Sequence, residues 1–320
     1  MTYLFENREL LYHMINHLNR RSIMEALYKV LISSTQLHDS DIKTDLFTRI
    51  LDVFDPLDIE QSQNIADLLT DSLSNKKNYN LILHNPTLFQ HFHSVCIKNL
   101  KFEFATKELL HVLIKLYENV LKDISNNPNS QIHLNFNDGM EFGGDIGNMM
   151  YEEEHNDKDH HKEIDIKTTM YIFPIIGETL KAIALDFYES IQATEEGSKQ
   201  SHKKSLGVKR YTQLEYFRSV LELIVYGIAS QLELDGDLMN MLKQIINTKV
   251  FEAIIFNFFE YEWNNLYQKV LEQIFNLIIY KSSPPELIEN VLYTCKFIEI
   301  MISKIIKQKF TFPYAYLFKF

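Results

Sequence analysis

Apolar residues recur along this chain with the spacing of one face of an α-helix. Between positions 107 and 124 they fall three or four residues apart or side by side, at Leu109, Leu113, Leu116, Tyr117, Val120, Leu121 and Ile124. Such steps place these side chains on one stripe of a helix. The same periodicity predicts helices over 5–19, 22–34, 40–54, 58–74, 86–99, 106–125, 173–193, 209–232, 236–247, 248–260, 262–281 and 285–308.

Two of these segments open with residues that favour a helix start. Ser22 and Glu25 have the spacing of a capping box, in which the hydroxyl accepts from a backbone N–H and the carboxylate reaches back. In the run Ser283-Pro284-Pro285-Glu286, Ser283 is the expected cap and Pro284 falls where no N–H is needed.

The short connections between so many helices predict an all-α fold in which neighbouring helices pack antiparallel. Glycine and proline are scarce, at 9 and 7 residues in 320, which disfavours an all-β sandwich or barrel. No fixed sequence period is visible, so we expect an irregular HEAT/armadillo-like helical-repeat solenoid.

The expected solenoid is continuous, with one half over 1–125 and the other over 166–320. Between them, residues 126–165 combine several glycines with an acidic run from 152 to 165. Such a segment buries too little apolar area to offset its ordering entropy, so it is predicted to be a flexible acidic loop. The polar stretch 194–205 is predicted to be a shorter linker.

Composition narrows the range of partners and compartments. The net charge of −11 disfavours nucleic acid and anionic membrane surfaces as partners. Cys96 and Cys295 are too few for a disulfide framework, which favours a reducing compartment, cytoplasmic and also nuclear. No uncharged apolar run reaches the length of a membrane span.

No motif of an enzyme stands out, so we expect no catalysis, no cofactor and no metal. A Gly-rich phosphate loop, a Gly-x-Ser-x-Gly elbow and a His-Glu-x-x-His pair are all missing from the sequence. His155, Asp157, Asp159, His160 and His161 are metal-ligand residue types, but a solvated charge run is the favoured interpretation. Cys96 shares a helical face with Phe92 and is interpreted as a buried, inert thiol, as is Cys295.

Several motifs resemble, in order along the chain, those of the SAPS family of phosphatase-associated proteins. The segment Phe258-Phe259-Glu260-Tyr261-Glu262-Trp263-Asn264-Asn265 resembles the family motif FFxYxWNN. Leu206-Gly207-x-x-Arg210-Tyr211 resembles LGxxRL, and Leu292-x-x-Cys295-x-x-Ile298-Glu299 resembles the helix LxxCxLIxRI. Weaker likenesses cover residues 3–33, 58–69, 98–121 and 314–317, while the family's first segment and its long acidic tail have no counterpart.

This resemblance implies a non-catalytic regulatory subunit that binds a serine/threonine protein phosphatase catalytic subunit of the phosphatase 6 type and directs it to substrates. Further scaffold proteins are additional expected partners. The expected contact residues are Trp263, Asn264, Asn265, Tyr261 and Arg210, with helix capping and an internal salt bridge as their structural alternatives. The alternative function is a general α-solenoid adaptor in a cytoskeletal or trafficking assembly without a phosphatase.

Overall fold

The amphipathic segments of the chain form helices throughout the part that can be described. The structure is a computed structural model, and it describes residues 8–32, 40–126, 171–197, 208–229, 235–247, 250–260, 265–280 and 284–307. Every regular element among these residues is helical, which confirms the predicted all-α class. The predicted loop 126–165 lies almost entirely outside the described residues.

The helices of the first half run from α2 to α8. Their bounds are α2 Arg8–Ile15, α3 Arg21–Ile32, α4 Ser40–Asp52, α5 Ile59–Leu73, α6 Lys76–Leu83, α7 Pro86–Lys98 and α8 Glu103–Asn126. The second half comprises α9 Ile172–Gly197, α10 Val208–Ala229, α11 Asp235–Asn247, α12 Val250–Glu260, α13 Asn265–Tyr280, α14 Pro285–Glu289, the π-helical turn η2 Asn290–Thr294 and α15 Phe297–Lys307.

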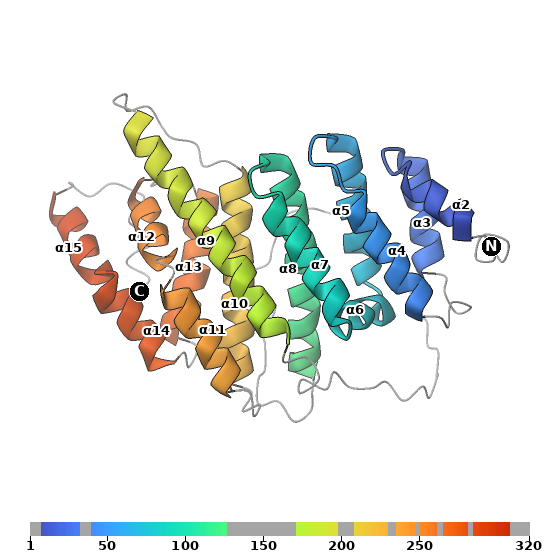
Figure 1. Cartoon of the computed structure of the whole chain (residues 1–320). Coiled ribbons are helices and arrows are strands. Elements are labelled where there is room, and N and C mark those ends of the chain that lie inside the picture. The colour runs from blue at the N-terminus through green and yellow to red at the C-terminus, as the bar shows by residue number, and fades with distance from the viewer. Residues whose placement is uncertain are drawn as a thin grey trace, which may run out of the picture.

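The helices stack side by side in chain order, from α2 at one end to α15 at the other (Figure 1). One row of packed neighbours is formed by α3, α5, α8, α10 and α13, and a second by α2, α4, α7 and α9, which α11 and α12 extend. Consecutive helices such as α2 and α3, α7 and α8, and α9 and α10 connect the rows. This packing is consistent with a helical-repeat solenoid.

The predicted stripe on α8 forms the middle of the core. Leu109, Leu113, Leu116 and Tyr117 are buried, and α8 packs against both α5 and α10. Full burial of a leucine side chain stabilises the folded state by roughly 1.5–3 kcal/mol. The long periodic stripe therefore locates the core correctly.

A chain of hydrogen bonds crosses this core and joins four helices. The hydroxyl of Thr179 in α9 donates to the carbonyl of Ile175 at 3.0 Å, so it accepts from Nδ1 of His93 in α7, 2.7 Å away. Nε2 of His93 then accepts from the hydroxyl of Tyr117 in α8 at 3.2 Å. The hydroxyl of Tyr117 in turn accepts from that of Tyr216 in α10 at 3.2 Å. The bonds thus run in one direction, and His93 is neutral.

Buried asparagines link neighbouring segments through hydrogen bonds to backbone carbonyls. The last carbonyls of a helix have no partner within it and need a donor from elsewhere. A buried asparagine amide supplies that donor at two places, Asn78 to Leu31 at 3.4 Å and Asn119 to Leu73 at 2.8 Å. A third, Asn64, donates at 2.9 Å to the carbonyl of Leu18 in the turn after α2.

The structure corrects both predicted helix starts. Helix α3 begins at Arg21, so Ser22 lies inside the helix, and the Glu25 carboxylate lies 3.4 Å from Nε of Arg21 instead of reaching back to a cap. At α14 the N-cap is Pro284 and the first helical residue is Pro285, one position later than predicted. Ser283 lies outside the described residues.

The element boundaries differ from the predictions in four further places. Helix α6 was not predicted, α2 ends at Ile15 before a turn, and α9 continues to Gly197 into the expected linker. The predicted single helix 285–308 is interrupted after η2, where Lys296 adopts a left-handed backbone with φ of 54°.

Candidate docking groove

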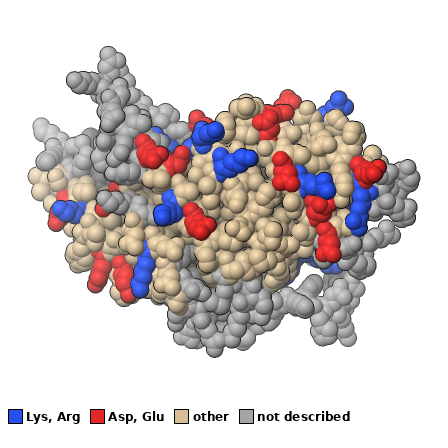
Figure 2. All heavy atoms as spheres, in the orientation of Figure 1, with Lys and Arg blue, Asp and Glu red and all other residues tan. Residues whose placement is uncertain are grey.

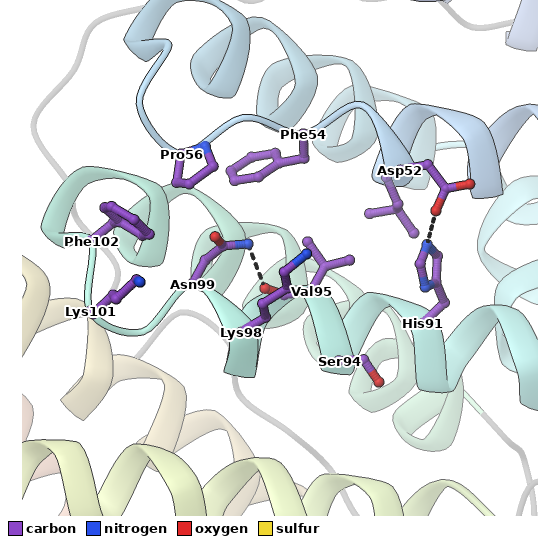
Figure 3. Close-up of a pocket in the computed structure, with 11 residues that line it drawn as sticks. Asp52, Phe54, Pro56, His91, Ser94, Val95, Lys98, Asn99, Lys101 and Phe102 are labelled. Atoms are coloured by element: carbon purple, nitrogen blue, oxygen red, sulfur yellow. Dashed lines mark hydrogen bonds and ion pairs between the residues drawn. The ribbon is translucent and has the colours of Figure 1, made fainter.

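A groove opens between the connection that follows α4 and the C-terminal end of α7. It encloses about 330 Å³ and is lined by Leu51, Asp52, Phe54, Pro56, His91, Ser94, Val95, Lys98, Asn99, Lys101 and Phe102. We call these residues the docking groove. In Figure 3, Phe54 and Pro56 lie along one side, the end of α7 along the other, and Phe102 closes one end.

The first wall of the docking groove is a turn held by its own side chains. The Asp55 side chain accepts from the backbone N–H of Leu57 at 2.9 Å, and the Asp55 backbone N–H donates to Gln61 at 3.0 Å. The Ser62 hydroxyl donates to the Asp55 carbonyl at 2.7 Å. The side chain of Asp58 caps α5 by accepting from the Gln61 N–H at 3.0 Å. Because each bond spans only a few residues, this turn positions Phe54 and Pro56 firmly.

The second wall is the turn between α7 and α8. The Asn99 amide donates to the Val95 carbonyl at 2.8 Å, and the Thr106 hydroxyl donates to the Asn99 carbonyl at 3.0 Å. The ammonium of Lys209, from α10, donates to the Leu100 carbonyl. The groove therefore has two walls whose shape is fixed before any ligand binds.

The two ends of the docking groove differ in charge. At one end Nε2 of His91 lies 3.0 Å from Oδ1 of Asp52, so the carboxylate already has a partner (Figure 3). At the other end Lys98 and Lys101 are exposed, and Nζ of Lys101 lies 5.0 Å from the ring centre of Phe102. Neither lysine forms an ion pair with a residue that the structure describes.

The buried polar residues do not form a second site of this kind. Burial lowers the pKa of His93 to about 3 and raises the pKa of the Cys96 thiol to about 12, so both are neutral. The ring nitrogens of His93 are both engaged inside the core, and Cys96 is fully buried. His93 and Cys96 therefore contribute to helix packing in the described core as neutral groups.

His93 and the two cysteines refine the sequence interpretation. His93 lies three residues before Cys96, and both are buried because residues three apart share a helical face. Cys295 is buried, its Sγ lies 3.4 Å from Oδ1 of Asn290, and burial raises the pKa of this thiol to about 11. Both thiols are therefore protonated, as expected of structural cysteines.

Most of the predicted contact residues fall where the structure gives no description. Tyr261, Trp263 and Asn264 lie outside the described residues, and Asn265 is the first residue of α13, with a side chain that is likewise not described. Arg210 lies near the start of α10, is half-buried, and is engaged by another group. The predicted metal ligands His155 to His161 also lie outside the described part.

The docking groove itself was not predicted from the sequence. Its residues come from three segments: the α4 end with the following turn, α7, and the turn after α7. Each of them was interpreted as a helix face or a connection. The only sequence signal was the pair of lysines beside Asn99 and Phe102, which is too common to nominate a site.

The charged side chains of the face seen in Figure 2 are interspersed. Basic and acidic groups alternate over the described part of that face and do not gather into one extended basic surface. Among the described residues, three or more metal-ligand side chains do not come together anywhere. The described helices include none with the length and apolarity needed to cross a membrane.

Comparisons with protein-family models, with curated proteins and with solved structures found no match for this chain.

Proposed function

We propose that this chain is a non-catalytic docking scaffold that binds a serine/threonine protein phosphatase catalytic subunit of the phosphatase 6 type. The observation that carries the scaffold role is the docking groove, an open and preorganised surface feature on a two-row stack of helices. Stacked helices of this kind present extended surfaces to partner proteins. The ionisable side chains of the groove lie in two groups, Asp52 with His91 at one end and Lys98 with Lys101 at the other.

The identity of the partner rests on the ordered SAPS-like motifs along the sequence. Residues 258–265 and Arg210 carry the most specific of these motifs, and both fall in the second half of the chain. We place the phosphatase contact there, with Trp263 as its central anchor, because tryptophan and arginine dominate the binding energy of many interfaces.

The test is purification of the tagged full chain from its native cells, followed by mass spectrometry of what accompanies it. The proposal expects the phosphatase catalytic subunit in stoichiometric amount. A stoichiometric complex without any phosphatase would favour the general adaptor instead, as part of a cytoskeletal or trafficking assembly. Recovery of the chain alone would contradict both forms of the scaffold role.

The substitution Trp263→Ala separates an anchor from a core residue. If Trp263 contacts the phosphatase, the variant keeps its helical circular dichroism and melting temperature but loses the partner. Gross unfolding of the variant would mark Trp263 as part of the core and remove it from the proposed contact.

A further inference from the structure

The docking groove has the features of a site for one extended peptide. Its volume of about 330 Å³ is at the small end of ligand pockets, enough for one or two apolar side chains. Phe54, Val95 and Phe102 provide apolar surface inside it. Outside it, Leu57 and Ile59 follow Pro56 in the chain and are 75% and 57% exposed, so apolar surface continues past the rim.

Asn99 offers one fixed polar contact to such a peptide. The residue is only 5% exposed, and its Nδ2 donates a hydrogen bond to the Val95 carbonyl. This bond orients the carboxamide, whose Oδ1 accepts no hydrogen bond from a described residue. A backbone N–H of an extended chain is the commonest donor that could meet it.

Charge complementarity selects the class of peptide. The chain as a whole carries a net charge of −11, yet the Asn99 end of the docking groove presents the two ammonium groups of Lys98 and Lys101. The one carboxylate that lines the groove, Asp52, lies at the other end beside His91. An acidic side chain is therefore attracted to the Asn99 end, and a basic one is not.

We propose that the docking groove binds an extended peptide segment of a client protein that carries an apolar side chain next to an acidic one. The apolar side chain enters between Phe54 and Val95, a peptide N–H donates to Oδ1 of Asn99, and the carboxylate pairs with Lys98 and Lys101. This assignment rests on the proposed scaffold function. It assigns the recruited protein to residues in the first half of the chain, whereas the proposed phosphatase contact uses residues of the second half.

The experiment uses a phage-displayed library of short random peptides, selected on the purified full chain without any phosphatase. The selected peptides are expected to share an apolar residue adjacent to aspartate or glutamate. Their affinity, measured by fluorescence polarisation, is expected to fall about tenfold or more in the variant Lys98→Glu/Lys101→Glu, because attraction becomes repulsion. Lys243→Glu, an exposed lysine on α11, is the matched control and should leave affinity unchanged.

A second variant tests the apolar part of the site independently of charge. Phe102→Ala is expected to weaken the binding of the same peptides at high salt, where the electrostatic contribution of the two lysines is screened. Selected peptides that are basic, or that bind the double lysine variant as tightly as the wild type, would overturn the proposal. Because no phosphatase is present, failure here leaves the phosphatase test unaffected, and failure of phosphatase capture leaves this result standing.

Discussion

At the scale of single residues, the main feature is the chain of hydrogen bonds that passes through His93. It places a neutral imidazole, a threonine and two tyrosines in a core where every unpaired polar group costs free energy. The direction of the bonds follows from one fact, the Thr179 hydroxyl donating to the Ile175 carbonyl. Tyr117 is therefore both donor and acceptor, while Tyr216 only donates.

Tyr117→Phe is expected to lower the free energy of unfolding by about 1–3 kcal/mol, because it leaves His93 without a donor and Tyr216 without an acceptor. Tyr216→Phe is expected to cost less, about 1 kcal/mol, because no donor is orphaned. Urea denaturation measures both, and Tyr293→Phe, at a side chain 71% exposed, is the control. Equal losses at Tyr117 and Tyr216 would contradict the assigned direction.

The depressed pKa of His93 makes stability depend on pH. Since burial lowers the pKa to about 3, the unfolded chain takes up this proton first as the pH falls. The contribution of His93 is complete above its unfolded pKa of about 6.5 and declines below it, by at most about 1.4 kcal/mol per pH unit. The difference in unfolding free energy between wild type and His93→Gln should thus shrink from pH 7 to pH 5, and a constant difference would argue against a buried neutral imidazole.

At the scale of elements, the break between η2 and α15 shows how a helix can end without glycine or proline. The Cys295 N–H donates to the Asn290 carbonyl at 2.8 Å, five residues back, and Lys296 then turns the chain with φ of 54°. A left-handed conformation costs a residue with a Cβ roughly 1–2 kcal/mol. The apolar periodicity continues across the break, so the sequence pattern predicted one helix there.

Lys296→Gly is expected to raise the free energy of unfolding by up to about 1 kcal/mol, because glycine adopts this backbone without a steric penalty. Lys243→Gly, an exposed position inside α11, should lower it by about 1 kcal/mol. Thermal denaturation of the two variants compares them directly. A loss of stability at Lys296 like that at Lys243 would mean that this break carries no strain.

Helices with long apolar stripes could be predicted from the sequence, whereas the short helix α6 could not. The α8 stripe from Leu109 to Leu121 gave nearly the observed bounds. Helix α6 is only 8 residues long and begins at Lys76, after the N-cap Asn75, whose side chain accepts from the Lys77 N–H at 2.9 Å. From the sequence alone, its buried Asn78 resembles a polar turn residue, because its hydrogen-bond partners lie in other helices.

At the scale of the whole molecule, the all-α class could be predicted from the spacing of apolar residues alone. The docking groove could be identified only from the three-dimensional structure. Its walls are two turns separated by α5, α6 and α7 in the chain, and they meet because α4 packs on α7. Periodicity identifies which face of each helix is buried but not which helices are neighbours. The phosphatase contact at residues 258–265 stays a prediction from motif resemblance.

The proposed function requires direct binding of a protein phosphatase catalytic subunit by this chain. Isothermal titration of the purified full chain with a purified phosphatase 6-type catalytic subunit tests it most directly. We expect saturable equimolar binding that persists in the Lys98→Glu/Lys101→Glu variant, because the docking groove is proposed to bind a different partner. Absence of binding heat, together with separate elution of the two proteins on size exclusion, would contradict it.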